Sequence, residues 1–314
     1  MYLGIDAGGT KTEALLIAPD GAICARGRFG PGNWESIGID AAIALYRGIV
    51  EQLVSDARIN PDSISAVGWG LAGVDWTSDE QRMTPLLVAL LPQARHTVVN
   101  DAYLPLRAGS DQPYGVAIIA GTGSTVVAVG MDGQRARTFG LGSDWGDFDG
   151  AQQLTRAACR VAAQAEYGMV PATLLTPALL SWSGAPSIPA LAESWSRGGS
   201  VPDLATFAPL LMNIARLGDS AAQQIVREAA ITLARNASAM ARRVDLQERV
   251  CDVVLAGGVA TGANDVFRAT FDTVLRAECP YAKIQILQRA PVAGAVLLAM
   301  DSVGHSMLTT RTEW

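Results

Sequence analysis

Short apolar runs alternate with longer stretches of helical spacing along the first third of the chain. Apolar residues dominate 2–5, 13–17, 22–28, 66–69 and 97–99, and turn-forming residues bound most of these runs, as is typical of strands. Residues 39–57 and 79–91 instead repeat apolar positions every three or four residues, which predicts helices. This alternation of strands and helices predicts an α/β fold.

The same order of elements starts again near residue 115. A strand over 116–120, a glycine turn over 121–124 and a strand over 125–129 repeat the pattern of 2–17, and "MDG" at 131–133 repeats "PDG" at 19–21. A recurring pattern indicates a duplicated unit. We therefore predict two lobes, residues 1–113 and 114–314, with a helical insertion over about 150–245 in the second. Strands over 252–256 and 283–287 and helices over 264–278 and 292–303 are expected to complete it.

Composition narrows the class of protein. The chain has 314 residues, of which 49% are hydrophobic and 17% charged, so it can bury two cores. Its net charge of −6 argues against a nucleic-acid partner. Its four cysteines form no C-x-x-C pair, and no apolar run reaches the roughly 18 residues of a membrane helix. With no basic leader at the N-terminus, we expect a soluble, cytoplasmic protein that does not bind membranes.

The first glycine turn, "DAGGTKTE" at residues 6–13, follows a strand that ends near Asp6. Glycines let backbone N–H groups come close to an anion. A carboxylate beside them suits a hydrated hard cation such as magnesium. If the turn stood alone, an ordinary hairpin with glycines at positive φ would be the favoured explanation.

A second turn of the same kind changes that balance. "AGTGST" at residues 120–125 also opens a three-strand unit, and the hydroxyls of Thr10, Thr12, Thr122 and Ser124 add donors. Two such hairpins facing one another across a cleft would hold a polyphosphate from both sides. We therefore predict a nucleotide phosphate with magnesium at Asp6.

A third glycine motif, "VVLAGGVATG" at residues 253–262, follows a buried strand. Bare backbone at the carboxyl end of a strand lets a flat ring lie close, and ligands of α/β sheets bind at such ends. A tight strand-to-helix connection is the alternative for this motif alone. Together with the two hairpins it indicates a surface for the nucleoside.

The motifs "DAGGTKTE", "NDA", "AGTGST" and "LAGGV", in a duplicated strand pattern, resemble the sugar kinase, Hsp70 and actin superfamily. Within it the chain is most similar to the BadF/BadG/BcrA/BcrD ATPase family, specifically to N-acetylglucosamine kinase-like members. The resemblance spans nearly the whole chain. It implies two ribonuclease H-like, actin-like ATPase lobes with a cleft between them, and ATP and Mg²⁺ as cofactors.

The resemblance also implies roles for individual residues. Asp6 would organise magnesium through water. The nucleotide would be bound by a first phosphate loop of Gly8, Gly9, Thr10, Lys11 and Thr12, a second loop of Gly121, Thr122, Gly123 and Ser124, and a nucleoside contact at Gly257 and Gly258. Asp101, at a strand end between the two repeats, stands where the family has its catalytic base.

Elementary chemistry supports the same role for Asp101. Phosphoryl transfer to an alcohol needs a carboxylate that orients the hydroxyl and takes its proton. The alternative is that Asp101 only caps a helix over 102–109, a common use of aspartate. Beside two phosphate loops we favour catalysis.

The loop "GPGNWES" at residues 30–36 matches the family loop in which an asparagine holds the sugar, which implies substrate contacts for Asn33 and Trp34 as well as Asp101. Asn33 could instead only turn the chain, and Trp34 could only cover the core. In "GLGSDWGDFDGA" at residues 140–151, Asp147 matches a sugar-contacting aspartate. Leu141 and the pair Phe148-Asp149 depart from the family pattern there, and Asp144 and Trp145 add polar and aromatic groups. Asp149 could also be the N-cap of the next helix.

We therefore expect an ATP-dependent sugar kinase that phosphorylates an amino sugar such as N-acetylglucosamine or glucosamine. An ATPase that drives a conformational change in a partner is the alternative within the same family, but those relatives hold an iron–sulfur cluster with paired cysteines that this chain lacks. A non-catalytic sugar or nucleotide sensor is a third hypothesis. Relatives are commonly dimers, which implies a homodimer.

Overall fold

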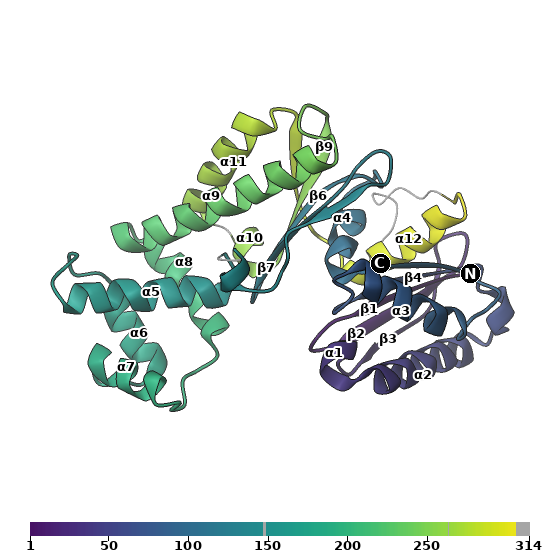
Figure 1. The fold of residues 1–314 in the computed structure, drawn as a ribbon, viewed down its shortest axis with the longest axis horizontal. Helices are drawn as coiled ribbons and strands as arrows, with labels where there is room; N and C mark the ends of the chain where they lie inside the picture. The colour runs from purple at the N-terminus through teal and green to yellow at the C-terminus, as the bar shows by residue number, and fades with distance from the viewer. Residues whose placement is uncertain (147–148, 263, 306–314) are drawn as a thin grey trace. The chain divides into compact units, whose positions relative to one another are not determined.

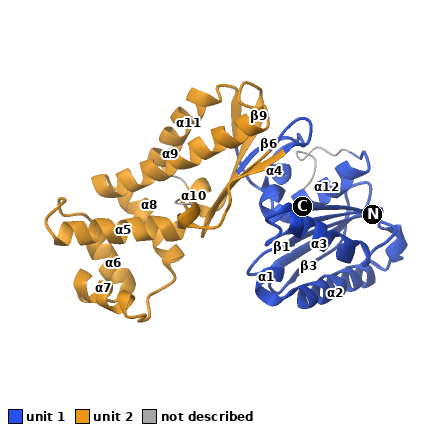
Figure 2. Ribbon diagram, viewed as in Figure 1, with its two compact units in different colours: residues 1–117, 129–134, 285–314 blue, residues 118–128, 135–284 orange. Residues whose placement is uncertain are grey.

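A computed structural model describes residues 1–146, 149–262 and 264–305. The chain forms two compact units (Figure 2). Unit 1 comprises residues 1–117 and 129–134 together with the C-terminal segment from residue 285, and unit 2 comprises residues 118–128 and 135–284. No helix in the described ranges is long and apolar enough to cross a membrane.

Unit 1 is built on a five-stranded mixed sheet, here sheet 1. Its strands are β1 (Tyr2–Ala7), β2 (Thr12–Ile17), β3 (Ile23–Phe29), β4 (Ala66–Leu71) and β5 (Arg95–Asn100). The order is β3-β2-β1-β4-β5, with β1 antiparallel to β2, β2 antiparallel to β3, and β1, β4 and β5 mutually parallel. The carboxyl ends of β1, β3, β4 and β5 therefore lie at one edge of the sheet.

Helices cover both faces of sheet 1 (Figure 1). On one face, α2 (Ile39–Ala57) and α3 (Thr77–Val88) pack over a core that includes Trp69, and α2 buries the stripe Ala42, Tyr46, Ile49, Val50 and Leu53. The other face carries α12 (Pro291–Ser302), beside α4 (Leu104–Gly109). Three short helices complete the unit: α1 (Trp34–Ile37), η1 (Pro61–Ser63) and η2 (Asp101–Tyr103).

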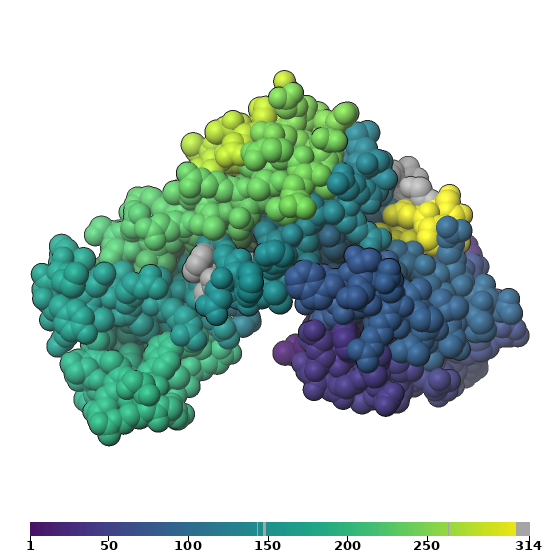
Figure 3. Space-filling model, viewed as in Figure 1, coloured from purple at the N-terminus to yellow at the C-terminus, as the bar shows by residue number. Residues whose placement is uncertain are grey.

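The C-terminal helix thus belongs with the N-terminal strands. Glycines in the sheet make this packing possible, because a Cβ at Gly68 would overlap the carbonyl oxygen of Ala295. The buried guanidinium of Arg107 on α4 also binds α12 through both carboxylate oxygens of Asp301, at 2.7 and 3.1 Å. The space-filling view shows the yellow C-terminal residues lying against the blue surface of earlier ones (Figure 3). The predicted division of the chain at residue 113 assigns this helix to the second lobe, and the compact units of the structure differ from it in that respect.

Unit 2 repeats the strand order of unit 1. Its sheet 2 contains β6 (Gly115–Ala120), β7 (Ser124–Val129), β8 (Arg135–Arg137), β9 (Cys251–Ala256) and β10 (Ala282–Ile286), in the order β10-β9-β6-β7-β8. Residues 115–117, 129 and 285–286 at the ends of these strands are counted with unit 1. Counted within its own unit, each sheet has the order third, second, first, fourth and fifth strand. The predicted α/β fold with a duplicated strand pattern is confirmed.

The chain between β8 and β9 is helical in the described residues. It forms η3 (Ser143–Trp145), α5 (Ala151–Glu166), α6 (Leu175–Ser183), α7 (Ile188–Ser196), η4 (Leu204–Phe207), α8 (Ala208–Arg216) and α9 (Ser220–Arg243). After β9 follow α10 (Gly258–Thr261) and α11 (Asp265–Glu278), and α11 packs along α9. The long α9 buries mostly alanine, which lets its neighbours approach closely.

Candidate functional site

The first predicted phosphate loop is a tight hairpin between β1 and β2. The Gly8 N–H donates to the carbonyl oxygen of Lys11 at 2.9 Å, so this N–H closes the turn itself, while Gly9 and Thr10 are exposed at the tip. Thr12 is buried, and its hydroxyl donates to the carbonyl oxygen of Gly30 at 2.9 Å. In this structure Thr12 therefore anchors the hairpin to the next loop, and the exposed tip is the part that can meet a ligand.

Lys11 is fixed by a neighbour on the same hairpin. Its ammonium group lies 2.7 Å from the carboxylate of Glu13, and both side chains are partly exposed. An exposed ion pair of this kind stabilises the fold by less than about 1 kcal/mol, so Lys11 can exchange Glu13 for a bound anion at little cost.

Asp6 lies near the end of β1, on the face of sheet 1 that carries α12. Burial raises the pKa of Asp6 to about 7, with further increases from the charges of Asp101 and Glu13 and a smaller opposing effect of Lys11. Asp6 and Asp101 are thus close enough to repel each other electrostatically. A divalent cation would relieve this concentration of negative charge.

Asp101 is the first residue of η2, directly after β5. The helix-capping alternative for Asp101 is wrong, because the cap is the neighbouring Asn100. The side-chain oxygen of Asn100 accepts a hydrogen bond from the Ala102 N–H at 3.0 Å. The carboxylate of Asp101 is therefore not needed to begin the helix.

The loop after β3 positions Asn33 and Trp34 at the same sheet edge. Asn33 caps α1 by accepting a hydrogen bond from the Glu35 N–H at 2.9 Å, and the Trp34 indole N–H donates to the carbonyl oxygen of Gly73 at 2.9 Å. The guanidinium of Arg82 lies 5.3 Å from the centre of the Trp34 ring. Asn33 therefore does stabilise the turn before α1, and Trp34 does pack against the core, as their structural alternatives predicted. Neither contact uses the amide nitrogen of Asn33.

A second layer of polar residues, not predicted from the sequence, lies at this edge. Asn100, which is 7% exposed, donates from its amide to a carboxylate oxygen of Asp75 at 2.8 Å. Asp79 in turn accepts hydrogen bonds from the N–H groups of Asp75 and Trp76 at 3.1 and 2.9 Å, which fixes the loop between β4 and α3. Asp75 follows the end of a buried parallel strand, as Asp101 does, and that shared position is the signal that could have found it.

Glu35 extends this polar group of residues. Burial raises the pKa of Glu35, and the carboxylates of Asp75 and Asp79 raise it further. In the loop that precedes α1, the carbonyl oxygen of Gly32 accepts a hydrogen bond from the Tyr46 hydroxyl at 2.6 Å. Burial, and to a lesser extent the charge of Asp101, raises the pKa of Tyr46, so this phenol stays neutral and keeps its hydrogen bond.

The second predicted phosphate loop, in unit 2, is also a glycine hairpin and is one residue shorter than the first. The Gly121 N–H donates to the carbonyl oxygen of Gly123 at 2.9 Å, and Thr122 and Gly123 are exposed. The N-terminus of α5 packs against this turn, since the Ala151 N–H donates to the carbonyl oxygen of Gly121 at 2.8 Å. A Cβ at Gly150 would overlap Gly123, so only glycine fits at the start of α5. Ser124 is buried at the beginning of β7.

Gly257 and Gly258 connect β9 to α10 in unit 2. Gly257 has a φ of +85°, and a Cβ there would overlap the carbonyl oxygen of Ala120, whereas an added Cβ at Gly258 would meet nothing within 4 Å. The first glycine is therefore required for packing against the second hairpin. Gly258, which is exposed, is the glycine of this pair that a ligand can reach.

The segment 140–151 is described in part. Asp147 and Phe148 lie outside the described residues. Asp149 is buried, and the N-cap of α5 is Gly150, so the capping alternative for Asp149 is wrong. Trp145 is 63% exposed and meets Phe139 edge to face at 5.8 Å between ring centres, and Leu141 is also exposed. Within the described ranges, no group of three or more His, Cys, Asp or Glu residues could hold a metal ion by itself.

Two sheets of identical strand order, each opening on a glycine hairpin, define an α/β protein of the actin-like ATPase fold class. The chain belongs to the BadF/BadG/BcrA/BcrD ATPase family, whose model matches residues 3–299.

Individual relatives cover almost the whole chain. The N-acetyl-D-glucosamine kinase of Dictyostelium discoideum is 26% identical and aligns with 96% of this chain and 98% of its own length. The N-acetylmuramic acid/N-acetylglucosamine kinase of Clostridium acetobutylicum is 25% identical over 95% of this chain and 97% of its own. A crystal structure from Chromobacterium violaceum, with the provisional name N-acetylglucosamine kinase, has a TM-score of 0.69 and 27% identity and covers 94% of this chain and 97% of that one.

Proposed function

We propose that this protein is an ATP-dependent kinase that transfers the γ-phosphate to a hydroxyl of an amino sugar, N-acetylglucosamine or glucosamine. The observation that supports it most is the arrangement of Asp6 and Asp101, which interact electrostatically at one sheet edge beside a glycine hairpin. Phosphoryl transfer needs a base at the acceptor hydroxyl and charge neutralisation at the phosphate. The names of the full-length relatives point to the same reaction.

Asp101 is the catalytic base in this proposal. Its carboxylate accepts the hydrogen of the acceptor hydroxyl, orients the oxygen toward the γ-phosphorus and takes the proton as the bond to phosphorus forms. Asn33 has its amide nitrogen available for a sugar oxygen, and the ring of Trp34 offers an apolar surface to the sugar. Asp147 remains a predicted substrate contact.

In this proposal the two hairpins and the β9–α10 connection bind ATP. The exposed or partly exposed residues of the predicted set would contact ATP: Gly9, Thr10 and Lys11 in the first hairpin, Thr122 and Gly123 in the second, and Gly258. The remaining residues would keep these loops in shape: Gly8, Thr12, Gly121, Ser124 and Gly257. The carboxylate of Asp6 fits a hydrated Mg²⁺, which uses one or two carboxylates together with phosphate oxygens. When bound, magnesium would neutralise charge that develops on the phosphates.

An assay of ADP release from magnesium-ATP tests the proposal across a panel of glucosamine, N-acetylglucosamine, N-acetylmannosamine and glucose. We expect release that depends on an amino sugar. Release that is the same with every sugar and without sugar would favour the partner-driving ATPase. Bound ATP without any release would favour a sensor. A homodimer in the cytoplasm stays a prediction of the family resemblance.

A further inference from the structure

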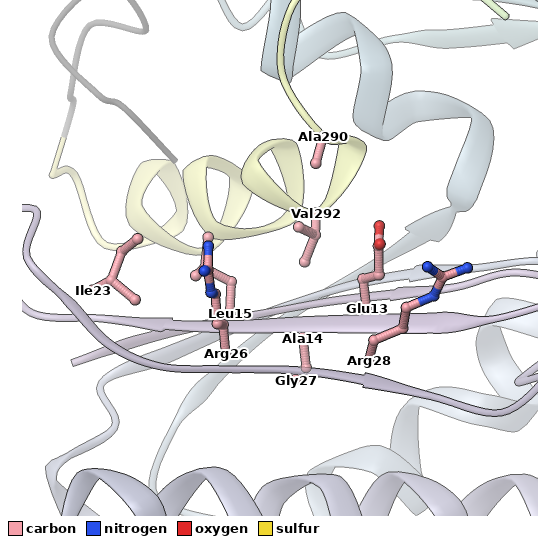
Figure 4. A pocket seen from close by; sticks show the side chains of 9 residues that line it. All are labelled: Glu13, Ala14, Leu15, Ile23, Arg26, Gly27, Arg28, Ala290 and Val292. Atoms are coloured by element: carbon pink, nitrogen blue, oxygen red, sulfur yellow. The ribbon is translucent and has the colours of Figure 1, made fainter.

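A groove on unit 1 is lined by Glu13, discussed above, and by other residues that the proposed kinase site does not use (Figure 4). It has a volume of about 370 Å³, at the lower end of the range of about 300–1,000 Å³ typical of small-molecule sites. Its walls are the strands β2 and β3 and the first turn of α12. The lining residues are Glu13, Ala14, Leu15, Ile23, Arg26, Gly27, Arg28, Ala290 and Val292.

Two arginines give the groove its charge. Arg26 and Arg28 alternate with Gly27 on β3, so both side chains lie on one face of the sheet, and Figure 4 shows them pointing, with Glu13, toward the side on which α12 lies. Neither arginine has an ion-pair partner in the described part of the chain. Glu13 is opposite Arg28 in the strand register, but its carboxylate is paired with Lys11. The groove therefore carries two arginines without an ion-pair partner among the described residues and one carboxylate, Glu13, in a protein whose net charge is −6.

The rest of the lining is apolar. Leu15, opposite Arg26 in the register, and Val292 are almost fully buried, and Ile23 adds an exposed aliphatic side chain. Among the described residues, the lining includes no Ser, Thr, Asn, Gln or aromatic side chain that could distinguish sugar hydroxyls. The chemistry of the walls thus suits a charged head group with an aliphatic body, and it does not suit a sugar.

We propose that this groove binds a small amphipathic anion, with a carboxylate or phosphate head on Arg26 and Arg28 and an aliphatic body over Leu15, Ile23 and Val292. Guanidinium groups hold carboxylates and phosphates through paired hydrogen bonds. The first turn of α12 adds the positive end of a 12-residue helix to the same wall. Because Glu13 joins the groove to Lys11, an occupant would lie one side chain away from the first hairpin.

Isothermal titration calorimetry with the full-length protein tests the site with octanoate and octyl phosphate as probes. Octanol lacks the charge and inorganic phosphate lacks the apolar body. We expect saturable 1:1 binding of at least one amphipathic anion, and binding of both controls at least about tenfold weaker. The comparison of the two probes distinguishes a carboxylate ligand from a phosphate ligand.

Three variants locate the binding. Arg26→Gln with Arg28→Gln should weaken it by roughly tenfold for each arginine, since each removes a charge-assisted hydrogen bond. Ile23→Asp, at an exposed position, should weaken it as well. Arg95→Gln, on the opposite edge strand β5, should leave it unchanged. The proposal is overturned if neither probe binds, or if the double arginine variant binds the probes as tightly as the wild type. Neither result depends on kinase activity.

Discussion

At the residue scale, the carboxylates at the edge of sheet 1 differ in what surrounds them. Asp79 accepts hydrogen bonds from backbone N–H groups of the loop between β4 and α3, and Asp75 accepts a hydrogen bond from Asn100. Asn100 in turn caps the turn that begins at Asp101. Asp75 is thus a positioning residue, which holds the strand end from which Asp101 projects.

Replacement of Asp75 by alanine should remove the acceptor of a buried amide. We expect kcat to fall about tenfold with little change in the KM for ATP, and the free energy of unfolding to fall by about 1–3 kcal/mol. Asp75→Asn keeps an acceptor oxygen and should restore most of kcat. Steady-state kinetics and urea unfolding of both variants measure this. Equal loss of kcat in the two variants would contradict a role through the hydrogen bond.

Asp6 should make stability depend on pH. Its pKa of about 7 in the folded protein lies above the 3.8 of an unperturbed aspartate, so the folded state binds more protons between these values and stability falls as pH rises through this window. Asp6→Asn removes the effect. The variant should therefore be more stable than the wild type at pH 8, by at most about 4 kcal/mol, and nearly equal to it below pH 4. Urea unfolding without nucleotide at both ends of the range tests the sign, and a wild type that is the more stable at pH 8 would contradict it.

Single residues also show what the sequence could and could not predict. Asp6, Asp101 and the turn glycines stood out because each lies at or just after the end of a strand and beside other residues typical of a binding site. Which residue of a motif binds a ligand and which one only stabilises the loop could not be predicted from the sequence. Whether Asn100 or Asp101 caps η2, and whether Thr12 faces a ligand or the Gly30 carbonyl, depends on a few ångströms of tertiary placement.

At the scale of elements, each glycine hairpin is held by one internal hydrogen bond and leaves its tip exposed. The duplicated pattern was enough to predict both hairpins and their strands, because the alternation of apolar residues and the turn chemistry are local. The packing of Gly150 and Gly257 against the second hairpin was not predictable in this way. Gly257 packs against Ala120, which lies more than a hundred residues earlier in the chain.

The two adjacent glycines before and at the start of α10 should respond differently to alanine. Gly257→Ala forces a side chain into a positive φ and against Ala120, which should lower the free energy of unfolding by more than about 2 kcal/mol. Gly258→Ala meets no neighbour and should stay within about 0.5 kcal/mol of the wild type. Guanidinium unfolding of the pair measures both. Similar losses would show that the connection is not packed as described.

At the scale of the whole molecule, the C-terminal helix packs on the N-terminal strands. α12 closes one face of sheet 1 and buries Val296, Leu297 and Met300, although about 190 to 290 residues separate it from the strands it covers. The helix itself was predicted from its apolar residues, and its destination was not. The glycines in β1 and β4, Gly4 and Gly68, were the available signal, since glycine in a strand marks a close approach of another segment.

A fragment of residues 1–117 should therefore fail to fold by itself. Several side chains that each contribute about 1.5–3 kcal/mol on burial would be exposed, and a domain has only about 5–15 kcal/mol of net stability. The matched control joins residues 1–117 to 285–305 through a glycine–serine linker and should fold cooperatively. Circular dichroism and thermal unfolding compare the two. A cooperative transition in the short fragment would contradict the role assigned to α12.

The central claim is that Asp101 is the base of an ATP-dependent sugar kinase, and one comparison tests it most directly. Amino-sugar-dependent ADP release and ATP affinity are measured for the wild type and for Asp101→Asn, with Asp56→Asn, an exposed carboxylate on α2, as the control. We predict that Asp101→Asn lowers kcat at least about 100-fold and leaves ATP affinity nearly unchanged. Wild-type turnover in the Asp101 variant would contradict the claim.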